Sequence, residues 1–95
     1  MAGRNWGLKG IAQRLQQTDV ASGHISLLEL VSDRRVLIEN YRGIYRYSDK
    51  SVIIHMDFGC ITVNGANLEL SQMDNEQLVI TGMIQEIMLS RGEYL

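Results

Sequence analysis

The sequence predicts a mainly all-β fold, an antiparallel meander curled into a small sandwich or partial barrel, with one short N-terminal amphipathic helix. After His24, apolar and polar residues alternate in short runs that are separated by turn signals. Both features are typical of antiparallel strands. Glycines recur at 43, 65 and 82 after strand-like runs, which hints at a repeat. A short β-solenoid is therefore the alternative fold.

The helix is predicted over residues 5–17. Leu8, Ile11 and Leu15 recur at helical spacing. Gly7 and Gly10 each weaken this helix by about 1 kcal/mol relative to alanine. A helix this short is marginal alone in water. We therefore expect it to dock, either on the sheet or on a partner.

The strand pattern is clearest at residues 52–58, where Val52, Ile54 and Met56 point one way and His55 and Asp57 the other. This is the pattern of a strand with one buried face. Turns are predicted at residues 32–34, 48–51 and 73–76, where Ser, Asp and Asn cluster.

Three glycine positions shape the remaining strands. Asn64-Gly65 lies between apolar alternations, and we predict a type I′ hairpin turn there. Arg42-Gly43 either bends one strand or separates two. Gly82 is predicted to bend the last long strand. Residues 85–89 fit the end of that strand or a helical turn.

Length and composition indicate one small domain. The 95 residues divide into a helix with its connector, residues 1–23, and a β domain, residues 24–95. The single cysteine allows no intrachain disulfide, which suits a reducing, intracellular setting. Because no apolar run could span a bilayer and no signal-peptide core is present, we expect a soluble, cytoplasmic protein.

Charge is distributed unevenly along the chain. Residues 1–18 hold three of the nine basic side chains and no acid, which leaves six bases and eleven acids in the remainder. A basic segment on an acidic body suggests that the segment meets a negative surface. The predicted docking residues, for a partner or as a peripheral membrane contact, are Arg4, Trp6, Leu8, Lys9, Ile11, Arg14 and Leu15.

No residue constellation indicates catalysis. His55, Asp57 and Cys60 lie close in sequence, but a metal site needs three or four converging ligands. Nothing marks Cys60 as an activated nucleophile. We therefore predict no catalytic residue, metal or cofactor.

A ligand- or nucleic-acid-binding β module is the alternative function. Three tyrosines lie between Tyr41 and Tyr47, beside Arg42 and Arg46. Base stacking on such a surface needs a basic groove. The acidic body argues against that groove, so no nucleic acid is expected.

Three motifs carry a family resemblance. They are Ile38-Glu39-Asn40-Tyr41-Arg42-Gly43-Ile44, Ile61-x-Val63-x-Gly65 and Leu78-x-Ile80-x-Gly82. With Tyr47, Gly59 and Leu68 they resemble the YabP/YqfC family of sporulation proteins, in particular its YqfC branch, over residues 24–89. The signature residues, expected to have structural roles, are Ile38, Glu39, Asn40, Arg42, Gly43, Gly65 and Gly82.

The resemblance implies a small non-enzymatic protein of endospore formation in a Gram-positive bacterium. Its expected location is the cytoplasm of the mother cell. It implies action by protein–protein contacts, with a sporulation membrane protein, with further copies of the chain, or with both. Open strand edges of a meander favour such association.

Overall fold

The computed structural model describes residues 25–92, so the helix predicted at residues 5–17 lies outside the described residues. The described residues form β1 (Leu27–Val31), β2 (Arg35–Glu39), β3 (Gly43–Tyr47), β4 (Ser51–Met56), β5 (Gly59–Met73) and β6 (Gln77–Arg91). They make one open sheet in the order β1-β2-β6-β5-β4-β3, and all neighbours are antiparallel. The all-β, antiparallel prediction is confirmed, and the solenoid alternative is wrong. The predicted meander is also wrong, because β2 pairs with β6 and not with β3, the next strand along the chain.

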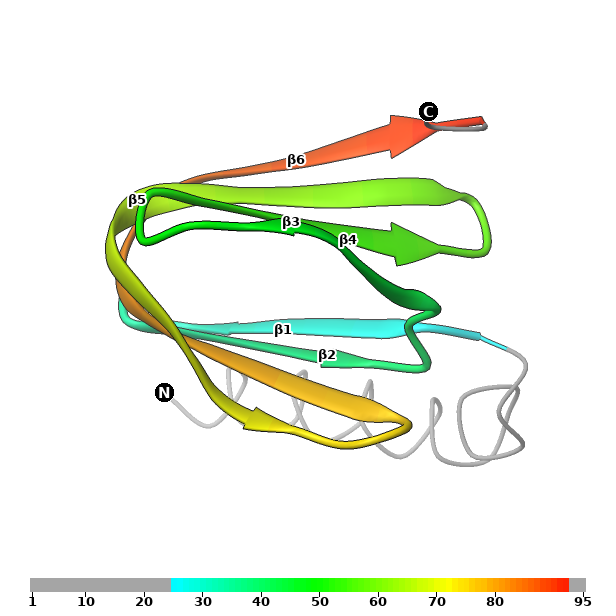
Figure 1. Cartoon of the computed structure of the whole chain (residues 1–95), viewed down its shortest axis with the longest axis horizontal. Coiled ribbons are helices and arrows are strands. Elements are labelled where there is room, and N and C mark those ends of the chain that lie inside the picture. Colours follow the sequence, from blue (N-terminus) through cyan, green and yellow to red (C-terminus); the bar gives the residue numbers. More distant parts are fainter. Residues whose placement is uncertain (1–24, 93–95) are drawn as a thin grey trace, which may run out of the picture.

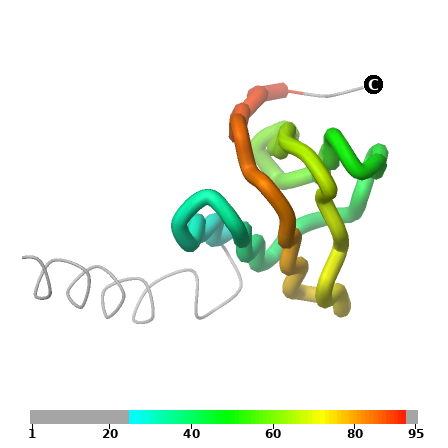
Figure 2. Tube along the Cα trace, turned by 90° about the vertical axis from the view of Figure 1, so that its left-hand side faces the viewer, coloured from blue at the N-terminus to red at the C-terminus, as the bar shows by residue number. Residues whose placement is uncertain are grey.

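The sheet folds over on itself because β5 and β6 form one long, bent hairpin (Figure 1). Only residues 77–81 of β6 pair with β2, and only residues 59–64 of β5 pair with β4. We call β1, β2 and the adjoining halves of β6 and β5 layer A. Layer B contains β3, β4, the first half of β5 and the second half of β6. Figure 2 shows β1 and β2 on one side of this hairpin and β3 and β4 on the other.

The core lies between the two layers. Both contribute to one buried apolar cluster, made of Val36, Ile38, Val52, Ile54, Met56, Ile61, Val63, Leu68, Leu78 and Ile80. Alternation places these side chains on the inner faces of their strands. The predicted inward face of residues 52–56 is therefore confirmed. Ile53 and Cys60 are also buried, although they lie outside this cluster.

The bend depends on glycines, because β5 and β6 approach each other closely there. A Cβ on Gly65 would lie 1.9 Å from the Met83 carbonyl oxygen. Gly82 has a φ of 140°, and its Cβ would lie 2.6 Å from the Asn67 carbonyl oxygen. The predicted bend at Gly82 is confirmed.

The hairpin predicted at Asn64-Gly65 is wrong, because both residues lie inside β5. Neither adopts the positive φ that a type I′ turn requires. The main-chain N–H of Gly65 instead donates to the Lys50 carbonyl at 3.0 Å. The hairpin turn falls earlier, at residues 57–58, between the paired residues Met56 and Gly59.

The other predicted turns are confirmed, and side chains hold two of them. The Ser48 hydroxyl accepts main-chain N–H bonds from Lys50 and Ser51 at 3.2 and 3.1 Å. The Asp74 carboxylate accepts N–H bonds from Glu76 and Gln77 at 2.9 and 2.8 Å. These bonds favour the charged carboxylate and lower the pKa of Asp74. Residues 85–89 continue strand β6.

Candidate functional site

The signature motif forms the crossover, residues 40–42, which carries the chain from β2 in layer A to β3 in layer B. Arg42-Gly43 thus separates two strands. Asn40 begins the crossover with a φ of 61°, a left-handed conformation that asparagine tolerates better than most residues. Its main-chain N–H donates to the Glu76 carbonyl at 2.7 Å, which ties the crossover to the β5–β6 turn.

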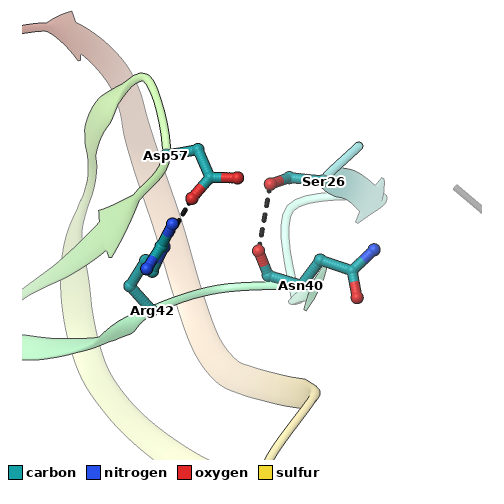
Figure 3. Close-up of polar contacts among 4 residues, drawn as sticks. All are labelled: Ser26, Asn40, Arg42 and Asp57. Atoms are coloured by element: carbon teal, nitrogen blue, oxygen red, sulfur yellow. Dashed lines mark hydrogen bonds and ion pairs between the residues drawn. The ribbon is translucent and has the colours of Figure 1, made fainter. Parts of the chain in front are cut away.

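Side chains extend these ties in two directions (Figure 3). The Asn40 amide donates to the Ile25 carbonyl at 2.6 Å, and the Ser26 hydroxyl donates to the Asn40 carbonyl at 3.0 Å. On the other side, Arg42 forms an ion pair with Asp57 in the β4–β5 turn. The crossover therefore fastens the start of β1 to one end of layer B.

The remaining signature residues lie in or near the fold's framework. Ile38 is fully buried in the core. Glu39 accepts a hydrogen bond from the Gln77 side chain at 3.0 Å. Gly43 begins β3 with open space around it, whereas Gly65 and Gly82 form the bend. Apart from Gly43, these residues therefore make contacts that hold the fold together.

The tyrosine-rich surface is tied to the fold at several points. The Tyr41 hydroxyl donates to the Asp74 carbonyl at 2.5 Å, and that of Tyr47 to the Leu68 carbonyl at 3.3 Å. Desolvation, followed by the nearby charge of Asp74, raises the pKa of Tyr41. The Tyr45 ring stacks on His55 with centroids 5.3 Å apart. The three tyrosines therefore contact the fold itself.

The structure brings together only two of the three residues His55, Asp57 and Cys60. His55 on β4 lies directly opposite Cys60 on β5, and the cysteine is fully buried. Asp57 instead lies in the turn and pairs with Arg42. Within residues 25–92, no three His, Cys, Asp or Glu side chains gather in a group that could hold a metal ion.

The open edges of the sheet carry its large exposed apolar side chains. In the described part of the chain, the edges are β1, β3, residues 69–73 of β5 and residues 83–91 of β6. The exposed apolar residues on these strands are Leu30, Val31, Tyr45, Tyr47, Met73, Met83, Met88 and Leu89. Exposed edges and apolar patches mark surfaces that bind other chains.

Sequence reasoning expected open edges but did not single out the second half of β6. A signal was present, because Ile87-Met88-Leu89 places apolar residues on both faces of a strand. The predicted docking residues, Arg4 to Leu15, lie outside the described residues.

Comparison with known proteins decides the family. The YabP family matches residues 22–94, which include every strand of the sheet. The chain belongs to the YabP family. The match confirms the resemblance carried by the sequence motifs, and it suggests a sporulation-related protein. No curated protein and no solved structure matches the chain. Within residues 25–92, this YabP-family protein has no helix long and apolar enough to cross a membrane.

Proposed function

We propose that this YabP-family protein serves endospore formation as a binding protein and catalyses no reaction. The observation that carries the proposal is the set of open sheet edges with exposed apolar side chains. Leu89 is 65% exposed and Met73 58%, although both lie on ordered strands. Burying such exposed apolar side chains against another chain would stabilise the complex.

The polar groups that could act in catalysis are paired with other side chains or buried, which supports a binding function. Arg42 is paired with Asp57, and Glu39 with Gln77. The thiol of Cys60 is fully buried. A nucleophile or general acid needs access to substrate. These side chains therefore suit a binding protein better than an enzyme.

The proposed partner is a sporulation membrane protein that the chain meets from the cytoplasm of the mother cell. The basic N-terminal segment supplies the attraction, through Arg4, Lys9 and Arg14. Each basic side chain contributes about 1 kcal/mol near an anionic membrane surface. Three charges alone hold a protein weakly, so Trp6 and Leu8 add apolar contact.

A pull-down from sporulating cells tests this function. The full chain, used as bait, should retain a sporulation membrane protein. Replacing Arg4, Lys9 and Arg14 together by glutamine should weaken that retention several-fold. Lys50→Gln is the matched control, because Lys50 is an exposed base in the β3–β4 turn. Equal retention by the triple variant would contradict the role of the basic segment, and turnover of a small molecule by the pure chain would contradict the proposal.

A further inference from the structure

We propose that the last part of β6, residues 86–91, pairs antiparallel with the same residues of a second copy of this chain. The two copies would then join their layers B into one continuous sheet. This inference rests on the proposed function, since it names one partner and the surface that binds it.

The edge is open along its whole length. Among the described strands, β6 contacts only β2 and β5. The pairing with β2 ends at Thr81, and the main-chain N–H groups of Gly82 and Ile84 still donate to the Arg34 and Asp33 carbonyls. Beyond them, residues 86–91 pair with β5 on one side and with no described strand on the other. Main-chain groups that point to the other side have no strand partner within residues 25–92, and such an edge is a template for another strand.

The other edges contain features that hinder pairing. β3 has a register shift between Ile44 and Arg46, and residues 69–73 of β5 have one between Leu70 and Gln72. β1 is a five-residue strand with Glu29 at its centre. By contrast, six consecutive residues pair without a shift from Glu86 to Arg91. This is the longest regular edge in the described part of the chain.

Apolar side chains on this edge are exposed, and burying them against a second chain would be stabilising. Leu89 lies opposite Ile61, on the face of the sheet that carries the core, yet it is 65% exposed. Met88, on the other face, is 45% exposed. Both faces of a strand that continued the sheet would therefore meet apolar side chains.

Residues 86–91 of one copy are also complementary to the same residues of a second copy in antiparallel pairing. A two-fold axis through Met88 places Ile87 opposite Leu89 of the second copy, and Glu86 opposite Ser90. The apolar pairs form on one face, with the two Met88 side chains on the other. The acid and the base lie at opposite ends, so antiparallel pairing brings the Glu86 end of one copy to the Arg91 end of the other. Parallel pairing would bring like charges together.

Solution mass and cross-linking test the inference on the full chain. Light scattering over a dilution series should show a dimer, and Leu89→Lys should reduce it to a monomer that keeps the β-sheet circular dichroism spectrum and still unfolds cooperatively. Its unfolding temperature should no longer depend on protein concentration, because folding is no longer coupled to association. Met73→Lys is the matched control, since Met73 is 58% exposed on a different edge, and it should leave the dimer intact. A short cysteine-specific cross-linker should join two chains of Met88→Cys.

Two controls locate the contact. The wild-type chain has only the buried Cys60 and should not cross-link. Met83→Cys should not cross-link either, because ten strand residues of about 3.4 Å separate the two copies of residue 83. A monomeric wild-type chain, a dimer that survives Leu89→Lys, or equal cross-linking at residue 83 would overturn the inference. A monomer that still retains a sporulation membrane protein would overturn self-pairing and leave the proposed function standing.

Discussion

Substituting alanine for Gly65 should destabilise the protein strongly, because the bend of the long hairpin has no room for a side chain. The added Cβ would lie 1.9 Å from the Met83 carbonyl oxygen, whereas ordinary contact begins at 3.4 Å. The two strands would therefore have to separate by about 1.5 Å, the difference between these distances. That movement disturbs the pairs Gly65↔Ile84 and Ala66↔Met83.

Two contributions add up to the loss in the free energy of unfolding. Two weakened ladder hydrogen bonds cost about 1 kcal/mol each. Overpacking adds about 1–3 kcal/mol. The sum, about 3–5 kcal/mol, is a large share of the about 5–14 kcal/mol expected for a chain of this length. Each kcal/mol lowers the unfolding temperature by about 4–8 °C in a small domain.

Gly43→Ala is the matched control, because it changes another signature glycine that has nothing within 4 Å of its Cβ. Its stability should change by less than about 1 kcal/mol. Urea unfolding followed by circular dichroism measures both variants. If Gly65→Ala proved as stable as Gly43→Ala, the close approach at the bend would be refuted.

The remaining predictions concern the crossover, one turn and the N-terminal segment. Asn40→Ala should cost about 2 kcal/mol in urea unfolding, because it removes a hydrogen bond and places alanine at a left-handed φ. Arg42→Gln should cost about 1 kcal/mol or less, and the cost should shrink in high salt, because its ion pair is exposed. The pKa of Asp74 is lowered in the fold, so its stabilising effect is present above the unfolded pKa and is lost as pH falls through the folded value. Asp74→Asn should therefore flatten the acid side of the stability–pH profile. Deleting residues 1–17 should weaken partner or membrane association and leave a cooperatively unfolding β domain, whereas loss of cooperative unfolding would show that this segment belongs to the core.

Local signals predicted the fold well where one strand or one turn decides the outcome. The alternation of Val52, Ile54 and Met56 follows from a single buried face, and Asp74 holds its turn through its own side chain. The pairing of β2 with β6 could not be predicted in this way. It joins Leu37 to Val79, far along the chain, and it depends on a bend formed elsewhere.

The Asn64-Gly65 prediction failed because tertiary packing overrode a local preference. A hairpin turn there would end β5, whereas the structure uses Gly65 to let β5 pass close to Met83. The true turn at residues 57–58 carries a weaker signal, because Asp57 and Gly59 favour a turn whereas Phe58 between them does not. The open edge at residues 86–91 was hard to predict for a related reason. Leu89 is exposed because the pairing of β2 with β6 ends at Thr81, and this end point depends on the tertiary fold.

If this protein works by contacts with other chains, cross-linking inside sporulating cells should capture those contacts. A photoreactive amino acid would replace Leu89, with the same substitution at Met73 as the control. We expect a cross-linked species at twice the chain's mass from residue 89 and no species of that mass from residue 73. A cross-link from residue 89 to a different sporulation protein would keep the contact function and overturn self-pairing. The absence of any cross-linked species from residue 89 of the folded protein would contradict binding through this edge.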